Sequence, residues 1–424
     1  MKEKSSISIY SWIVWGIGAS FFFIQYFPRI IPSIATVRLM QDFQVDALSL
    51  GGLSAFYLIA YISMQVPAGV LLDRFGVRRL LIVAVLAEAI GSLVFSTTET
   101  LHMAELARFL GGFGGAFAFV SAMKLAILWF PVRYFGVLAG ATQALGMLGA
   151  AIGQGPMAFV LSVYSWRTGL LFFSVAFFLL ALIVFFVVRD RKSPVHKPGQ
   201  HVARPEKLGF LDSLLFVLRN PQSWINAGYL GLVYGPTMVF AELWGVSYLQ
   251  GAYNISHEMA AMVVSMVFWG WAVGGPLTGW LSDHIGRRKP IMLASALASL
   301  VLITLIIYGT FIPLWMLFVC CFLYGVGNTG VGASYALSGE INPRRVAGTS
   351  IAFANMASII IGAFMQPIVG WLLVLFWDQK IVDGVPWYSV SDYQQAFISL
   401  PVCLIVGFVF AIFIKDSYCK PVEK

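Results

Sequence analysis

Apolar stretches long enough to cross a lipid bilayer follow one another along the whole of this 424-residue chain. A membrane-spanning helix needs about 20 consecutive residues that are mostly apolar. Divided by that length and by clusters of Gly, Pro and charged residues, the sequence predicts twelve spans, at 10–36, 48–72, 80–98, 103–129, 137–162, 169–188, 223–249, 259–282, 290–311, 314–338, 346–376 and 395–414. Because a backbone in hydrocarbon must satisfy its own hydrogen bonds, this pattern predicts an all-α membrane protein.

Composition excludes most other classes of protein. Hydrophobic residues make up 59% of the chain and charged residues 11%, against roughly 45–50% and 25% in soluble domains. A soluble enzyme, a disordered scaffold or a disulfide-stapled secreted module does not have this composition. The four cysteines show neither a disulfide framework nor metal-ligand spacing. We therefore expect no metal site and no cofactor.

The placement of the positive charges predicts the orientation in the membrane. With both termini on one side of the twelve spans, that side receives 21 of the 27 Lys and Arg residues, and the opposite loops keep only Arg38, Arg167 and Lys380. Cytoplasmic loops carry such an excess of cations. Both termini are therefore expected in the cytoplasm, and the net charge of +8 requires no nucleic-acid partner.

The two halves of the chain repeat each other. Trp12 recurs as Trp224 and Asp73 as Asp283, at offsets of 212 and 210 residues. Transporters are often built from such repeats around a site at the membrane midplane. We expect a six-helix bundle at 1–188, a cytoplasmic linker at 189–222 and a second six-helix bundle at 223–424.

Two loop motifs at equivalent positions resemble a known family. The sequence reads GVLLDRFGVRR from Gly69 to Arg79 and GWLSDHIGRRK from Gly279 to Lys289. Both resemble the loop signature of the major facilitator superfamily, and Arg108 with Gly112 and Gly115 resembles its fourth-span pattern. The resemblance implies twelve helices in two bundles that rock alternately toward each side. It also implies a gating role for the loop residues Asp73, Arg74, Gly76, Arg78, Asp283, Gly286, Arg287 and Arg288.

The loop motif is interpreted as a latch. We expect Asp73 to accept hydrogen bonds from arginines or from a helix N-terminus across the interface between the bundles. Gly76 would allow a tight reversal of the chain, and Arg78 and Arg79 would lie at the lipid phosphates. His284 stands where the pattern usually has Arg, so the second latch is expected to be weaker or pH-sensitive.

Within the superfamily, the segments Pro28 to Ser33 and FAELWGVSYL around Glu242 look like the bacterial intraphagosomal amino-acid transporter group. That likeness implies uptake of amino acids or nucleosides. Glu242 departs from the pattern, which has a small residue before Leu243-Trp244.

Arg29 and Glu242 are ionisable residues inside spans, which marks a functional site by default. They lie at nearly equal depth on the first and seventh spans, which the resemblance places along the central pathway. An Arg facing a Glu could bind the two ends of a zwitterion, or Glu242 could carry a coupling proton. Alternatively the two residues pair to hold the outer gate, or Arg29 extends only to the headgroups.

Three further charges lie within spans. Arg108 either pairs with Glu105 on its own helix or takes part in substrate or proton coupling, which the resemblance favours. The depths of Glu88 and Lys124 match by our sequence estimate, so a neutralising pair is expected, with proton coupling by Glu88 as the alternative. Unpaired, Lys124 would face the cavity and attract anions.

Polar and aromatic groups at similar depth complete the candidate cavity. They are Gln25, Tyr26, Tyr57, Tyr61, Gln65, Gln143, Tyr234, Trp244, Asn328, Tyr335 and Asn355. Tyr and Trp also gather at membrane interfaces without binding a ligand, so packing remains the alternative for each.

The sequence therefore predicts a proton-coupled importer of amino acids or similar metabolites, working as a monomer in the inner membrane. No phosphate-binding loop is found, so an ion or solute gradient must drive transport. A multidrug or organic-ion antiporter is the nearest alternative, and a membrane receptor is an alternative of another class. The five His lie in loops or at span ends, which argues against a membrane-embedded enzyme.

Overall fold

The fold is all-α apart from one short hairpin. The computed structural model describes residues 8–131, 134–190, 210–309, 311–343, 346–382 and 384–419. The first half contains α1 (Ile9–Ile24), α2 (Tyr26–Ile34), α3 (Thr36–Phe43), α4 (Ala47–Phe75), α5 (Val77–Thr97), α6 (Leu101–Trp129), α7 (Phe135–Val163) and α8 (Trp166–Val187). The second contains α9 (Phe210–Arg219), α10 (Pro221–Val239), the π-helix η2 (Phe240–Trp244), α11 (Gly245–Tyr253), α12 (His257–Ile285), α13 (Lys289–Tyr308), α14 (Leu314–Asn328), α15 (Val331–Glu340), α16 (Ala347–Phe376), the strands β1 (Ile381–Val382) and β2 (Val385–Pro386), α17 (Val390–Ala396) and α18 (Ser399–Phe413).

Eleven helical segments in the described residues are long and apolar enough to cross a membrane. They correspond to eleven of the twelve expected spans, with bounds that differ by a few residues. The remaining expected span, 223–249, coincides with α10, η2 and α11, which follow one another directly but are not among the eleven. The count of twelve spans therefore stays a prediction.

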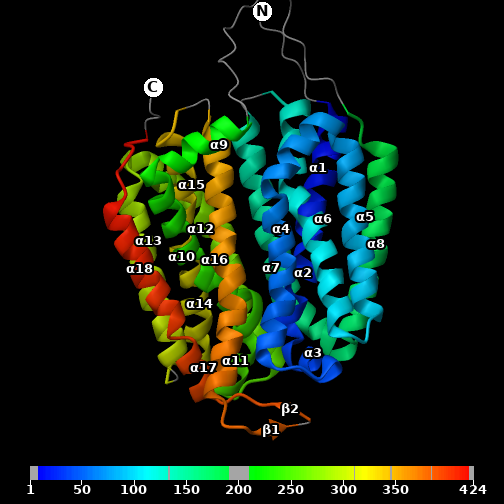
Figure 1. The fold of residues 1–424 in the computed structure, drawn as a ribbon, viewed down its shortest axis with the longest axis vertical. Helices are drawn as coiled ribbons and strands as arrows, with labels where there is room; N and C mark the ends of the chain where they lie inside the picture. The colour runs from blue at the N-terminus through cyan, green and yellow to red at the C-terminus, as the bar shows by residue number, and fades with distance from the viewer. Residues whose placement is uncertain are drawn as a thin grey trace, which may run out of the picture.

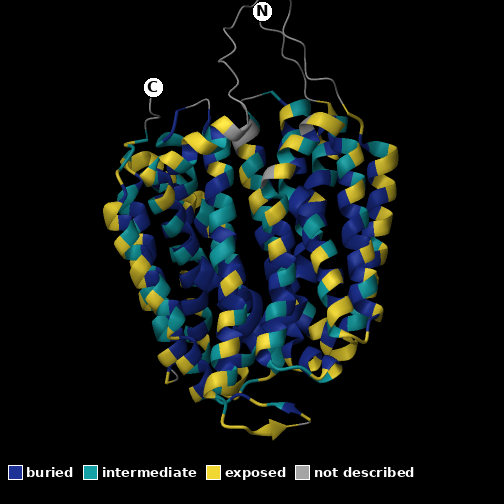
Figure 2. Ribbon diagram, viewed as in Figure 1, coloured by how far each residue is buried: buried dark blue, intermediate teal, exposed yellow. Residues whose placement is uncertain are grey.

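The helices run side by side in two groups (Figure 1). Helices α1 to α8 form one group and α10 to α18 the other, with α4 against α16 and α7 against α12 between them. The start of α1 and the end of α18 lie at one end, here called the linker end; β1 and β2 lie at the opposite, hairpin end. Buried residues line the inside of the bundles and exposed ones face outward (Figure 2). Many exposed side chains are Phe, Leu, Ile and Val, which suits a lipid surround.

Backbone-to-backbone contact closes the hairpin end between the two groups. A Cβ added at Gly51 of α4 would lie 2.7 Å from the Pro367 Cα, and one at Gly370 of α16 would lie 2.4 Å from the Ala47 carbonyl oxygen. The Ala47 amide also donates to the Tyr388 hydroxyl at 3.1 Å. We call this contact of α4 with α16 the hairpin-end seam.

The linker end is organised by aspartates that follow the last span of each half. Asp190 accepts a hydrogen bond from the Arg78 amide at 3.0 Å, at the start of α5. Asp416 accepts one from the Arg288 amide at 3.0 Å, beside the start of α13, and pairs with the Arg287 Nε at 3.2 Å. An anion at a helix N-terminus is stabilised by the backbone amides there. Each half is therefore tied to itself at this end.

These contacts correct part of the latch hypothesis. The Arg78 guanidinium donates to the Phe185 carbonyl in its own half, and its expected place at the lipid phosphates stays a prediction. Asp283 pairs with Arg288 of the same loop, not with the other half. The side chain of Asp73 lies outside the described residues. The reversal at Gly76 is confirmed, since its φ is +84°.

The other residues of the loop motifs have local contacts. Arg74 lies over the Phe75 ring at 5.4 Å. His284 stacks on Trp280 with ring centroids 5.3 Å apart. Gly286 has a φ of +69° and ends α12, so both loop glycines adopt the left-handed backbone that favours glycine.

Substituting Asp416 tests this tie. Burial alone would raise the pKa of Asp416, but the Arg288 and Tyr418 amides and the Arg287 guanidinium outweigh burial and hold the pKa below its usual value. Asp416→Asn should lower the free energy of unfolding by about 1–3 kcal/mol at neutral pH. A lowered pKa stabilises the fold above the unfolded value of about 3.9, and the difference should vanish as pH falls through the folded pKa. Thermal unfolding at neutral pH and at a pH below the folded pKa measures the difference between Asp416→Asn and the parent protein. Asp212→Asn, at an exposed position, is the control and should leave the stability unchanged at both pH values.

Candidate functional site

Arg29 and Glu242 meet between the two halves, as one of the sequence hypotheses requires. The Arg29 Nε donates to the Glu242 Oε2 at 3.1 Å, and its Nη2 lies 2.9 Å from both carboxylate oxygens. Each residue is only 5% exposed. A planar guanidinium binding a carboxylate through two nitrogens is among the strongest polar contacts in proteins. In this state each charge therefore neutralises the other.

Both partners lie where a long helix is irregular. The first span is interrupted at Gln25, between α1 and α2, and Glu242 lies in the π-helix η2. Pro32 has no amide hydrogen, so the Pro28 carbonyl lacks its helical donor. Irregular helices are common at the binding sites of transporters, and π-helices at functional sites generally.

Arg108 replaces the missing donor. Its Nη1 donates to the Pro28 carbonyl at 2.9 Å, and its Nη2 lies 3.4 Å from the Arg29 carbonyl. Glu105 instead contacts His102 at 3.2 Å, so the alternative of a Glu105–Arg108 pair is wrong. Arg108 therefore holds the backbone that carries Arg29, which composition and spacing did not suggest.

Aromatic rings surround the two arginines. The Arg29 Cζ lies 5.2 Å from the Tyr26 ring centroid and 5.7 Å from that of Tyr61, and the Arg108 Cζ lies 4.6 Å from that of Tyr57. Ring faces attract cations at such distances. These three tyrosines of the candidate set are thus brought together around the charges.

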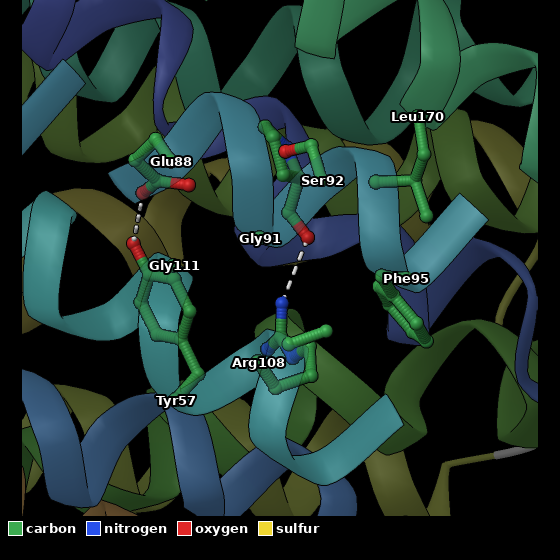
Figure 3. A pocket seen from close by; sticks show the side chains of 10 residues that line it. Tyr57, Glu88, Gly91, Ser92, Phe95, Arg108, Gly111 and Leu170 are labelled. Carbon is green, nitrogen blue, oxygen red and sulfur yellow. Dashed lines mark hydrogen bonds between the residues drawn. The ribbon is translucent and has the colours of Figure 1, made fainter. Parts of the chain in front are cut away.

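The sequence analysis expected Glu88 to pair with Lys124, but Glu88 contacts Tyr57 instead (Figure 3). Its Oε1 lies 3.2 Å from the Tyr57 hydroxyl, which also lies 2.7 Å from the Gln25 Oε1. Glu88 packs against the turn of α6 at Gly111 to Gly115. Lys124 lies nine or more residues further along α6, at least about 13 Å away at 1.5 Å per residue, so the matched depths were wrong.

The remaining candidates separate into two kinds. The Asn355 Nδ2 donates to the Gln65 Oε1 at 2.9 Å, and the Tyr335 hydroxyl donates to the Asn355 Oδ1 at 2.9 Å, which places a polar group between α4 and α16. Trp244 and Asn328 are buried and donate to the backbone, Trp244 to the Gln366 carbonyl at 3.2 Å and Asn328 to the Val233 carbonyl at 2.9 Å.

Tyr234 packs edge-on against Trp271, and Gln143 is exposed on α7. Among the described residues, no hydrogen bond or ion pair joins Gln143, Trp244 or Asn328 to the Arg29–Glu242 pair.

A small polar cavity adjoins the pair. It is lined by Arg29, Ser54, Leu58, Arg108, Glu242 and Gln366. The Ser54 Oγ, the Arg108 Nε and the Gln366 Oε1 are buried without a hydrogen-bond partner among the described residues. Buried polar atoms of this kind are usually met by water or a ligand group. Sequence reasoning missed Ser54 and Gln366, because a lone Ser or Gln in a span resembles packing.

No group of three or more His, Cys, Asp or Glu side chains within the described ranges could hold a metal ion. The described site brings together two arginines, two carboxyl groups and the surrounding hydroxyl and amide groups.

Comparison with known proteins identifies the family. A model of the Major Facilitator Superfamily matches residues 13–249 and 243–423. The chain belongs to the Major Facilitator Superfamily. The expected fold class is confirmed by this match and by the all-helical architecture.

Relatives and solved structures agree with that assignment. A probable L-galactonate transporter of Escherichia coli is 24% identical over 82% of this chain and 80% of its own length. A probable sulfoacetate transporter of Cupriavidus necator is 23% identical over 65% of this chain and 66% of its own length. A bacterial homolog of the human lysosomal transporter Spinster, in an inward-facing and occupied conformation, superposes with a TM-score of 0.77 at 14% identity, over 96% of this chain and 97% of that one.

This superfamily member is a multi-pass membrane transporter of small organic solutes, and not an enzyme. The finer resemblance to the intraphagosomal amino-acid group is not confirmed by these matches.

Proposed function

We propose that this transporter carries small organic acids and that Arg29 recognises their carboxylate group. The observation that carries the proposal is the buried Arg29–Glu242 pair, in which a carboxylate already accepts hydrogen bonds from the Nε and Nη2 of the guanidinium. A substrate carboxylate would take the place of the Glu242 carboxylate. The relatives named for L-galactonate and sulfoacetate support an anionic substrate.

Proton coupling follows from the same exchange. A protonated Glu242 is neutral and no longer competes for Arg29, so proton binding would free the guanidinium for the substrate. Leaving Arg29 buried without an anion is costly. Proton and substrate are therefore expected to bind together, and to leave together when the site faces the other side.

Alternating access is supported by where the two halves are joined. In the described residues, the hydrogen bonds between halves join Ala47 to Tyr388 and His257 to the Ile34 carbonyl at the hairpin end, and Arg29 to Glu242 further in. The Gln65–Asn355 bond lies on the linker side of the middle of α4 and α16, and none of the bonds between described residues of the two halves lies at the linker end itself. We propose that the linker end opens in this state, toward the cytoplasm. The excess of Lys and Arg at that end supports cytoplasmic termini in a bacterial inner membrane. We propose that the protein works as a monomer. Its two bundles, joined by the linker at 189–222, would then move relative to each other within one chain.

Counterflow in proteoliposomes tests the function. Vesicles loaded with L-galactonate, sulfoacetate, a neutral sugar or an amino acid are diluted into the labelled form of the same solute, at equal pH and with an inward proton gradient. We expect counterflow for the acids and none for the neutral sugar. An amino acid offers the same carboxylate and an ammonium group for Glu242, so transport of amino acids alone would favour the original sequence prediction. A lack of counterflow for every solute would contradict a carrier.

Substituting Arg29 by lysine tests carboxylate recognition. Lysine keeps the charge but loses the planar pair of donors, so Arg29→Lys should raise the apparent KM for an acid by about 10-fold or more, the effect of about 1.4 kcal/mol. Arg38→Lys, at a cation that donates to the Leu161 carbonyl, is the matched control and should leave KM unchanged. An unchanged KM in Arg29→Lys would remove bidentate recognition.

A further inference from the structure

Glu88 is a buried acid outside the Arg29–Glu242 pair. It lies on α5, is 1% exposed and forms no ion pair with any residue that the structure describes. An ionised carboxylate is costly in such surroundings unless cations or several donors satisfy it. The only side-chain hydrogen bond found for it in the described chain joins it to Tyr57.

The hydrogen-bond partners of the Tyr57 hydroxyl indicate whether Glu88 is protonated. A phenol has a single proton to donate, and two oxygens lie within reach, the Gln25 Oε1 at 2.7 Å and the Glu88 Oε1 at 3.2 Å. The Gln25 Nε2 faces the Phe22 carbonyl at 3.5 Å, so the Gln25 oxygen is the one turned toward Tyr57. With the phenol proton on Gln25, the second contact is a hydrogen bond only if Glu88 carries a proton and donates it.

The glycines of α6 make room for this cluster. A Cβ at Gly115 would lie 2.3 Å from the Tyr57 hydroxyl and 3.1 Å from the Glu88 Oε1. A Cβ at Gly114 would lie 3.0 Å from the Glu88 Cγ. The helix backbone therefore packs against the carboxyl group, which leaves little space for the waters that an ionised group requires.

We propose that Glu88 is a second proton-carrying group and that Arg108 transmits its state to Arg29. Arg108 and Glu88 line one pocket together with Pro28 and Tyr57 (Figure 3). With Glu88 neutral, Arg108 holds the Pro28 and Arg29 carbonyls. When Glu88 releases its proton to water, the new carboxylate attracts the Arg108 guanidinium away from those carbonyls. The segment that carries Arg29 then loses the donor that Pro32 cannot supply.

The charges around Glu88 fit this role. Arg108 faces it from α6 and Tyr57 from α4, while Leu170 of α8 is apolar and Ser92 of α5 is uncharged. Arg29 of α2 is held by Glu242. Arg108 is therefore the nearby cation that is not already paired with a carboxylate in the described structure, and it acts as a positioning residue for Arg29.

Infrared spectroscopy of the purified protein tests the proton directly and needs no substrate. We expect a carbonyl band of a protonated carboxylic acid at neutral pH that is lost in Glu88→Gln and retained in Glu99→Gln, an exposed control between α5 and α6. Tyr57→Phe should shift the frequency of that band. Absence of a band dependent on Glu88 overturns the proposal. If Glu88→Gln does not fold, the shift in Tyr57→Phe decides.

Transport then tests the coupling, which rests on the proposed function. In Glu88→Gln, counterflow of an accepted acid at equal pH should persist, whereas an inward proton gradient should drive less accumulation than in the parent protein, because Glu242 remains as the one proton-carrying group of this proposal. Glu99→Gln should accumulate as the parent protein does. Accumulation in Glu88→Gln equal to that of the parent protein overturns the proposal. Failure of all acids in the parent protein would contradict the proposed function alone, since the infrared result is independent of it.

Discussion

Replacing Arg29 by methionine should lower the free energy of unfolding by about 3–5 kcal/mol, because it leaves the Glu242 carboxylate buried without its partner. The same variant should lose transport of organic acids, since the Arg108 guanidinium at this site is engaged by the backbone carbonyls of residues 28 and 29. Chemical or thermal unfolding in detergent and counterflow in vesicles measure the two effects separately. This is the largest stability effect that we expect from one substitution in the protein.

The double variant Arg29→Met/Glu242→Leu separates charge burial from packing. Apolar residues of similar volume can replace a buried ion pair at little cost, so most of the lost stability should return while transport stays absent. Equal instability of the single and double variants would show that packing, not the unpaired carboxylate, dominates at this site.

Replacing Gly51 by valine should move the conformational equilibrium away from the structure described above. The added side chain would meet the Pro367 backbone, with the Cβ 2.7 Å from its Cα, and backbone cannot turn aside as a side chain can. Overpacking costs about 1–3 kcal/mol, which corresponds to a shift of about 5- to 150-fold in the ratio of closed to open seam. The state in which the hairpin end is open contains no such clash and should gain population.

Accessibility of a cysteine behind the seam reports this shift. Ser54 is buried beside the Arg29–Glu242 pair, so Ser54→Cys in a background without the four native cysteines should react slowly with a water-soluble maleimide. Adding Gly51→Val should accelerate the reaction. Gly52→Val is the matched control, because a Cβ at Gly52 meets nothing within 4 Å. Equal labelling of both variants would show that the seam does not limit access.

Much of the fold follows from hydropathy, because length and apolarity are all that a spanning helix requires. Hydropathy does not show where a helix is interrupted within a span. The interruption at Gln25 and the π-helix around Glu242 depend on which side chains replace lost backbone bonds. The short helix α3 and the hairpin of β1 and β2 were missed, because a search for spans of about 20 apolar residues does not detect elements this short, although Leu39, Met40 and Phe43 of α3 are buried at helical spacing.

The site was predictable where the repeat constrained it. Arg29 and Glu242 lie at nearly equal distances from the repeated Trp12 and Trp224, which predicted that they could meet, and they do. Depth along separate helices was a poor guide for Glu88 and Lys124, because tilt and axial offset between α5 and α6 cannot be obtained from residue counts. The role of Arg108 as a backbone donor depends on Pro32 lying on another helix, which no local pattern indicates.

Asp190 and Asp416 have a consequence for how the protein can be produced. Each aspartate fastens the end of the last span of its half to the start of another helix in the same half. Neither half therefore depends on a continuous chain to hold its own linker end together. A gene divided within the codons for residues 191–209 should yield two polypeptides that insert separately and reassemble in the membrane into a working carrier. Co-purification of a tagged first fragment with an untagged second one would demonstrate that reassembly.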